Sequence, residues 1–362
     1  MEEIIKTVGL PEDNGPHNYG VEWWYFNGHL KDKEGKEYSF MDCLFKVDLT
    51  KVYIPHILNH PLKNHLQKGE YVYFAHSVVS DISNKKNYKE IQNISLVSAD
   101  SFIGDKFFVS YKNPMIFGHK IKSEIKELDS NGFHIKTKNL DLKLESRKDP
   151  LFEGGHGYVG TPKAGSYYYS LTDMKASGNL NIDKKEIEVE GIAWMDHQWA
   201  DVEYNKEKKD KWTWFSFQLE NGMEIMCVEY SKKDGVDILV DTIDKNGKQS
   251  QYKNAILKAG NDIWKSEKTK AEYPQSWHIE IADAEIVIDA HSIVDDQEMI
   301  FGQINYWEGS MDIIAQINGD KIKGKGFMEL VGYPSDYNYL LLEGEEFEQD
   351  ILEKLKKFFR KK

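Results

Sequence analysis

The segment from Gly191 to Trp199 carries side chains that are well suited to chemistry. It reads Gly-Ile-Ala-Trp-Met-Asp-His-Gln-Trp and has the character of a β-strand. Alternate residues of a strand face the same side, so Trp194 and Asp196 share one face, and His197 and Trp199 share the other. A carboxyl group walled by indole rings has a raised pKa and can act as a general acid near neutral pH. A structural interpretation stays open, in which Asp196 caps a turn and His197 is a core histidine with satisfied hydrogen bonds.

A second group of aromatic and polar residues lies in a predicted β-hairpin. Two apolar runs, which begin at Trp212 and Met223, flank the dipeptide Asn221-Gly222, and Asn-Gly is a typical two-residue hairpin turn. Such a turn places Trp214 opposite Glu229, on one face with Trp212. A face that mixes Trp, Gln and a carboxylate fits a ligand-lined barrel interior. It fits a half-exposed sheet equally well.

Aromatic rings and carboxylates occur together twice more. Near the N-terminus, Glu22 and Trp24 share one face of a predicted strand, and late in the chain Trp307 and Glu308 are adjacent. Aromatic walls with a few polar groups bind sugars, polyenes or prenyl chains, and they stabilise developing cations. The composition does not distinguish among these ligands.

Other chemistries find little support in the sequence. His56, His60 and His65 invite a metal site, but Pro55 and Pro61 interrupt the segment, so we predict a surface loop and no metal. The glycines around His156 precede no helix that would hold a phosphate, and no nucleophile elbow occurs. We therefore expect a site without a metal or an organic cofactor. Cys43 and Cys227 are predicted to be buried free thiols.

Composition narrows the class of protein further. The 362 residues carry a formal net charge of −13, which argues against nucleic acid as a partner because phosphate binding needs concentrated positive charge. The apolar runs are too short for a transmembrane helix. The first residues lack a secretory signal, so the sequence as given predicts either a cytoplasmic location or a protein whose signal has been removed. The oligomeric state is not evident from the sequence.

Short alternating apolar runs separated by turn residues predict an all-β fold. The charged stretch 201–211 is the best candidate for a domain boundary. At the end of the chain, Phe347, Ile351, Leu355 and Phe358 recur at helical spacing and predict an amphipathic helix. Its basic last turn suggests a peripheral contact with an anionic membrane, although packing on a barrel is the more usual role of such a helix.

Several of these clusters, taken in order, resemble a known family, the two-domain lipocalin-like proteins that include carotenoid 1,2-hydratases and AttH-like proteins, often labelled predicted secreted hydrolases. The resemblance covers residues from about 20 to 335. The matching stretches are Glu22-Trp-Trp-Tyr25, Phe74-Ala-His-Ser77 with Asp81, Ser166-Tyr-Tyr-Tyr-Ser170, Ala193-Trp-Met-Asp-His-Gln-Trp199, Trp212-Thr-Trp-Phe215, Tyr273-Pro274 with Trp277, Tyr306-Trp-Glu-Gly309, and Gly326-Phe-Met-Glu-Leu330 with Gly332-Tyr333. One departure is Ala200, where many relatives have Gly.

The resemblance implies two consecutive antiparallel lipocalin-like β-barrels packed together, at 1–200 and 201–342, followed by the amphipathic helix at 343–362. It also implies hydration or cyclisation of an alkene in a hydrophobic, isoprenoid or polyketide-like small molecule, without a cofactor. A non-catalytic carrier of a lipophilic ligand and, less favoured, a hydrolase are the alternatives.

Combining the residues with the resemblance gives a set of candidate site residues. The predicted catalytic residues are Asp196 or Glu229 as proton donor and His197 as the group that positions or deprotonates water. The predicted substrate-binding residues are Glu22, Trp24, Tyr168, Trp194, Trp199, Trp212, Trp214, Trp307 and Glu308.

Overall fold

The chain is built almost entirely from antiparallel β-strands. The computed structural model describes residues 6–48, 71–95, 99–103, 106–112, 122–129, 131–161, 164–201, 211–232, 235–301 and 304–333. Within these ranges the helical elements are three short 3₁₀ turns, η1 (Glu12–Asn14), η2 (Glu153–Gly155) and η3 (Ala282–Ala284), and there is no α-helix. The predicted all-β class is therefore confirmed. The predicted helix at 343–362, most of the boundary at 201–211, and His56, His60 and His65 lie outside the described residues.

The first half of the chain forms one large sheet. Its strand order is β4-β3-β2-β1-β13-β12-β9-β8-β7-β6-β5, with β10 and β11 paired to β12. The strands are β1 (Val21–Asp32), β2 (Glu37–Asp48), β3 (Tyr71–Asp81), β4 (Lys86–Ser95), β5 (Ala99–Ile103), β6 (Lys106–Lys112), β7 (Lys122–Glu127), β8 (Phe133–Lys136), β9 (Leu140–Ser146), β10 (Leu151–Phe152), β11 (Tyr158–Thr161), β12 (Ala164–Ile182) and β13 (Lys185–Ala200).

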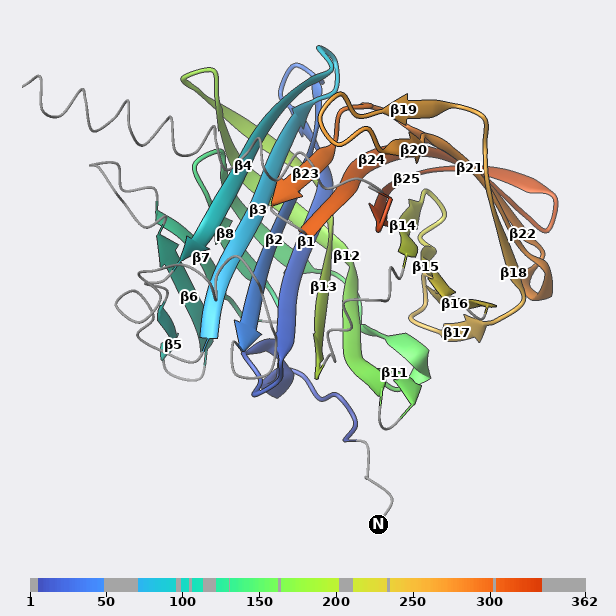
Figure 1. Ribbon diagram of the computed structural model, residues 1–362, viewed down its shortest axis with the longest axis horizontal. Coiled ribbons are helices and arrows are strands. Elements are labelled where there is room, and N and C mark those ends of the chain that lie inside the picture. The colour runs from blue at the N-terminus through green and yellow to red at the C-terminus, as the bar shows by residue number, and fades with distance from the viewer. Residues whose placement is uncertain are drawn as a thin grey trace, which may run out of the picture.

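The second half forms a separate sheet beside the first (Figure 1). Its order is β17-β16-β15-β14-β25-β24-β22-β21-β18, with β23 paired to β24 and a small β19-β20 ribbon alongside. The strands are β14 (Lys211–Leu219), β15 (Glu224–Lys232), β16 (Gly235–Ile243), β17 (Gln249–Tyr252), β18 (Ala255–Ala259), β19 (Ile263–Lys265), β20 (Glu272–Pro274), β21 (Ser276–Ile281), β22 (Ile286–Ser292), β23 (Glu298–Phe301), β24 (Ile304–Ile317) and β25 (Asp320–Val331).

The two sheets do not form the closed barrels that we expected. Among the described strands, β4 and β5 remain the edges of the first sheet, and β17 and β18 remain the edges of the second. The architecture is thus two large antiparallel sheets, each curved around its own core. No helix in the described ranges is long and apolar enough to cross a membrane.

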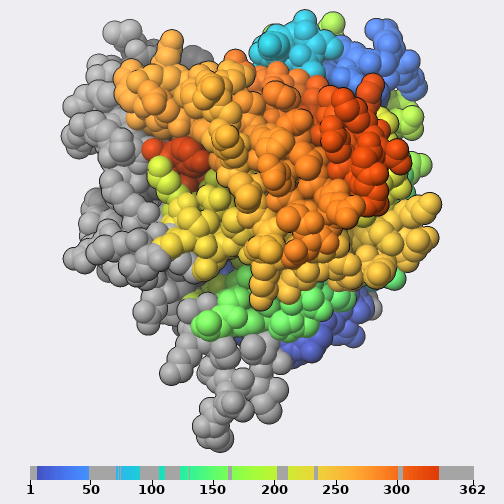
Figure 2. Space-filling view, turned by 90° about the vertical axis from the view of Figure 1, so that its right-hand side faces the viewer, coloured from blue at the N-terminus to red at the C-terminus, as the bar shows by residue number. Residues whose placement is uncertain are grey.

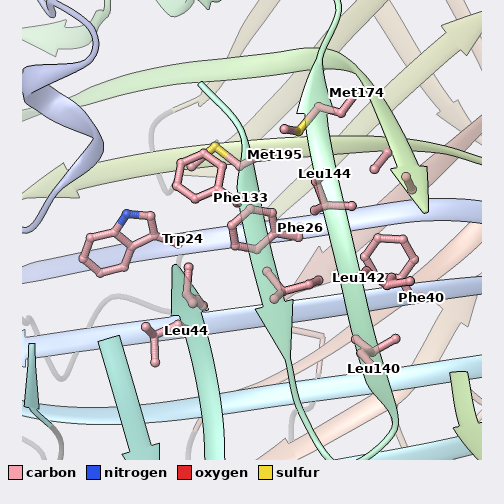
Figure 3. Close-up of a cluster of buried hydrophobic side chains, with 14 of the residues drawn as sticks. Trp24, Phe26, Phe40, Leu44, Phe133, Leu140, Leu142, Leu144, Met174 and Met195 are labelled. Carbon is pink, nitrogen blue, oxygen red and sulfur yellow. The ribbon is translucent and has the colours of Figure 1, made fainter. Parts of the chain in front are cut away.

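Each sheet folds over on itself and buries a hydrophobic core. In the first sheet, Trp24, Phe26, Phe40 and Leu44 from β1 and β2 face Phe133 and the leucines of β9 (Figure 3). The second sheet encloses a comparable core around Phe215, Phe217 and Trp307. Cys43 and Cys227 are buried free thiols, as predicted.

A third buried cluster lies between the outer faces of the two sheets, and we call it the junction. It combines aromatic and aliphatic residues from both halves: Tyr25, Met41, Cys43, Val78, Leu151, Tyr168, Trp194, Trp214, Met226, Val228, Leu239, Ile243, Met299, Tyr306 and Phe327. The strands that border it are therefore buried on both faces, which explains their nearly continuous hydrophobic character.

Buried hydrogen bonds fix how the two sheets sit against each other. Gln218 of β14 donates to the carbonyls of Thr172 and Ala193, at 2.7 and 3.0 Å. The backbone N–H of Gly154 donates to Asp241 Oδ2 at 3.0 Å. In Figure 2 the segment around this contact, in green, lies along the lower edge of the second sheet. Bonds of this kind are directional, so they set the register of a junction that apolar packing alone would leave less specific.

Strands β1 and β13 approach so closely that one glycine has no room for a side chain. A Cβ added to Gly191 would lie 1.9 Å from the carbonyl oxygen of His29. We expect Gly191→Ala to lower the free energy of unfolding by about 1–3 kcal/mol, because the strands must separate. Gly9 has open space around it, so Gly9→Ala is the matched control and should change stability by less than about 0.5 kcal/mol. Equal urea midpoints for the two variants would contradict this account.

Candidate active site between the two sheets

Asp196 is the centre of a hydrogen-bonded network at the junction. Its side chain leaves β13 on the same face as Trp194 and is only 3% exposed. Oδ1 accepts hydrogen bonds from Trp194 Nε1 and Ser170 Oγ, both at 2.6 Å, and Oδ2 accepts one from the Tyr168 hydroxyl at 3.0 Å. The predicted sharing of one face by Trp194 and Asp196 is confirmed.

Burial raises the pKa of Asp196 from 3.8 to about 7. The hydrogen bonds from Ser170, Trp194 and Tyr168 act in the opposite direction, because they favour the carboxylate. The balance leaves a carboxyl group that can both hold and release a proton near neutral pH. This is the property required of a general acid.

Ser170 connects Asp196 to a second buried carboxyl group. Ser170 Oγ lies 2.8 Å from Glu153 Oε1 as well as 2.6 Å from Asp196 Oδ1. A serine hydroxyl has one proton to donate, so both contacts are hydrogen bonds only if one carboxyl group is protonated. Burial and the nearby Asp241 raise the pKa of Glu153 well above its ordinary value, which makes Glu153 the protonated partner.

Two further carboxyl groups lie on the second sheet. Glu308 of β24 and Glu329 of β25 are directly opposite each other, and the Tyr25 hydroxyl donates to Glu308 Oε1 at 2.5 Å. Burial raises the pKa of Glu329 to about 7. Burial and the neighbouring Glu329 raise the pKa of Glu308 well above its usual range. The pair therefore holds a proton on Glu308 and loses one first from Glu329.

Aromatic rings from both sheets wall these carboxyl groups. Trp214 Nε1 donates to the Tyr168 hydroxyl at 3.0 Å, which extends the Asp196 network into the second sheet. The Trp214 ring also meets Tyr25 and Trp194 edge to face, at centroid distances of 5.5 and 6.4 Å. The junction is thus a packed cluster of aromatic and apolar side chains with acidic groups at fixed positions, and this composition is similar to the lining of small-molecule sites.

A different polar cluster occupies the interior of the first sheet. His197 leaves β13 on the face opposite Asp196, and its Nε2 lies 2.9 Å from Glu22 Oε1. Its ring stacks on Trp24 and contacts Trp199. Burial alone would raise the pKa of Glu22, but hydrogen bonds from His17 and His197 outweigh it and lower the pKa to about 2.

The structure distributes the predicted site residues over three places. Tyr168, Trp194, Asp196, Trp214 and Glu308 meet at the junction, and Trp212 lies at its half-buried edge. Glu22, Trp24, His197 and Trp199 lie inside the first sheet. Glu229 and Trp307 belong to the second sheet's interior side. His197 and Glu229 are therefore not brought together with Asp196.

The position of Glu229 corrects our expected hairpin register. Glu229 pairs with Thr213, and Trp214 pairs with Val228. The loop contains three residues, Glu220 to Gly222, because Leu219 closes it by hydrogen-bonding to Met223, and Gly222 has a φ of +79°. One extra turn residue shifts the register by one and moves Glu229 to the opposite face from Trp214.

Sequence reasoning missed several acidic members of the junction, namely Glu153, Asp241 and Glu329. Asp241 and Glu329 sit singly within apolar strand segments, the same signal that singled out Asp196. That signal could have found them, whereas nothing local distinguishes Glu153, which lies in a 3₁₀ turn between short strands.

Fold and site together define an all-β protein of two packed antiparallel sheets with an acidic, aromatic junction. The chain belongs to the AttH-like family, because the sequence model of that family matches residues 4–333. The resemblance deduced from the motifs is thereby confirmed.

Solved structures share this fold at low sequence identity. A protein of Nitrosomonas europaea, whose structure was solved as that of an AttH candidate, is 23% identical with a TM-score of 0.73, and the match covers 91% of this chain and 98% of that one. Kievitone hydratase from Nectria haematococca is 14% identical with a TM-score of 0.65, covering 92% and 95%. CghA, crystallised with Sch210972, is 13% identical with a TM-score of 0.56, covering 86% and 88%.

A curated relative also matches in sequence. Dehydratase asqC of Emericella nidulans is 21% identical over 205 residues, which are 53% of this chain. The match spans 58% of the length of that dehydratase.

The raised pKa of Asp196 predicts a pH-dependent stability. Because the folded-state pKa is about 7 against an ordinary 3.8, this contribution to stability is complete below about pH 4 and is lost as the pH rises through about 7. We expect the stability of the wild type, relative to Asp196→Asn, to fall by roughly 1 kcal/mol per pH unit across that window. Urea unfolding at several pH values measures the difference.

The exposed Asp262 supplies the control for this experiment. Because both variants remove one carboxyl group, the difference between their pH profiles isolates the effect of burying Asp196. If Asp196→Asn and Asp262→Asn change the pH dependence of stability in the same way, burial does not raise the pKa of Asp196 in the folded protein.

Proposed function

We propose that this protein is a cofactor-free hydro-lyase that adds water to, or removes it from, a hydrophobic isoprenoid or polyketide-like small molecule at the junction. The observation that carries the proposal is Asp196, a buried carboxyl group with a pKa raised to about 7 and enclosed by Trp194, Trp214 and Tyr168. Hydratase and dehydratase names among the relatives support the same reaction class.

In the hydration direction, protonated Asp196 donates its proton to one alkene carbon, and the other becomes a carbocation. The faces of Trp194 and Trp214 stabilise that positive charge. Water attacks the cation and forms a C–O bond, and the resulting oxonium loses a proton to a carboxylate. Ionised Glu329 accepts that proton, and transfer back to Asp196 restores the starting state. Dehydration follows the same steps in reverse.

The pKa values of the acidic groups at the junction differ in a way that suits these proton transfers. Glu308 keeps its proton and hydrogen-bonds with Tyr25, while Asp196 and Glu329 both titrate near 7. Neighbouring acids with divided protonation states are a common arrangement for acid–base catalysis. His197, on the other face of β13, supports the strand in this mechanism and does not touch the substrate.

A hydrophobic ligand has a matching approach to the junction. Trp23, Phe45, Trp212 and Tyr230 are only partly buried and pack against the rim of the cluster. Half-buried aromatic residues beside an apolar enclosure favour an apolar ligand. A net charge of −13 argues against a polyanionic one.

The direct test is turnover of a panel of prenylated and polyene alkenes, and of the matching tertiary alcohols, in water enriched in oxygen-18. We expect one labelled oxygen in the hydrated product, measured by mass spectrometry. Asp196→Asn should lower kcat roughly 100- to 10,000-fold, because an amide cannot donate the proton. The surface variant Asp262→Asn is the control and should turn over like wild type.

Two results would overturn the assignment. Loss of turnover in Glu229→Gln, with full turnover in Asp196→Asn, would make Glu229 the proton donor. Tight binding of the panel with no label in any product would identify the protein as a carrier of lipophilic ligands.

A further inference from the structure

We propose that His17, Glu22 and His197 form a binding site for one divalent transition-metal ion, with Zn²⁺ as the preferred ion. This site lies inside the first sheet, on the opposite face of β13 from Asp196, and is independent of the proposed function. His17 Nδ1 lies 2.8 Å and His197 Nε2 lies 2.9 Å from the same atom, Glu22 Oε1. Both imidazole nitrogens therefore lie against one carboxylate oxygen, and the three potential ligand atoms lie within 4.8 Å of one another.

The other nitrogen of each imidazole is already engaged by Asp13. His197 Nδ1 lies 3.0 Å from the Asp13 carbonyl oxygen, and a carbonyl can only accept, so Nδ1 carries the hydrogen. His17 Nε2 lies 3.2 Å from the Asp13 carboxylate. In the absence of a metal, the two nitrogens that face Glu22 can only donate to its carboxylate. Each donation requires a second N–H on an imidazole whose other nitrogen already faces an acceptor. A divalent cation can replace these two protons and use the same three atoms as ligands.

This arrangement is the one that proteins use to orient histidine ligands. Metal-bound histidines donate their second N–H to a carboxylate or a backbone carbonyl, which fixes the tautomer and the ring orientation. Asp13 supplies both kinds of acceptor from a single residue. Two histidines and a glutamate are also a donor set used by zinc enzymes, in which a fourth position remains for water.

The rings are held rigidly before any ion binds. His17 stacks on Trp199 at a centroid distance of 3.8 Å and an interplanar angle of 6°. His197 stacks on Trp24 at 4.6 Å. The side chains of Glu22 and His197 are fully buried, and that of His17 is 18% exposed, so an ion would enter from the His17 side.

Lys46 contacts the other oxygen of the Glu22 carboxylate, while the backbone N–H of His17 donates to both oxygens, at 3.0 and 2.9 Å. The Lys46 ammonium group lies 3.3 Å from Glu22 Oε2, the oxygen that neither imidazole contacts, and 2.6 Å from the His17 carbonyl. The metal and the ammonium would therefore use different oxygens of one carboxylate. Bound metal would tie residues 13 to 17 to strands β1 and β13.

Metal binding by the full-length protein tests the proposal. The protein is stripped with a chelator, equilibrated with Zn²⁺, desalted and analysed by inductively coupled plasma mass spectrometry. We expect one zinc per chain in the wild type and none in His17→Ala, whose partly exposed loop position lets the strands keep their fold. Co²⁺ in place of Zn²⁺ should give the visible absorption of a tetrahedral site, and His17→Ala should remove it.

Two variants complete the design. Asp13→Asn should weaken Zn²⁺ binding about 10- to 100-fold, because it removes the outer carboxylate that orients His17. His278→Ala is the matched control, since His278 is an exposed imidazole with Asp289 and Glu280 at 2.7 and 3.1 Å, and it should keep one zinc per chain. Failure of the wild type to retain zinc, or retention by His17→Ala, would overturn the proposal.

Discussion

The burial of both faces of strand β13 from Ala193 to Ala200 shapes the rest of the molecule. β13 lies between β1 and β12 in the first sheet, with its own core on one side and the second sheet on the other. Every buried polar side chain in this part of β13 must therefore find partners inside the protein, because an unsatisfied buried polar group is costly. Asp196 finds them at the junction and His197 finds them inside the sheet. One strand thus organises two polar clusters that do not touch.

The junction contains several buried acidic groups. Apolar side chains at the same positions would stabilise the fold more. Asp196, Glu153, Glu308 and Glu329 all have raised pKa values there, and burial is the main cause for each. Raised values mean that the fold disfavours the charged forms. Proteins tolerate such destabilising groups mostly at functional sites, where the shifted pKa is itself useful. The chemistry that we propose for this protein therefore lies between the sheets.

The cluster around Glu22 has the opposite character. Its carboxylate is kept ionised by surrounding donors, so the pKa is lowered to about 2. It ties the segment before β1 to two central strands, and its aromatic neighbours hold the imidazoles in place. One face of β13 thus carries an acid whose pKa is about 7, and the other face meets the ionised carboxylate of Glu22 in β1 together with two histidines.

The sequence by itself determined the all-β class, the alternation of Trp194 and Asp196 against His197 and Trp199, the buried thiols and the family. These follow from the period of two in a strand, which is a local property. The tertiary structure alone decided which faces meet. The three-residue loop after Leu219 shifted the hairpin by one and moved Glu229 away from Trp214, since a shift of one residue reverses every side chain. Likewise, the meeting of Asp196, Glu308 and Glu329 depends on packing between strands more than 100 residues apart in the chain, which no local pattern encodes.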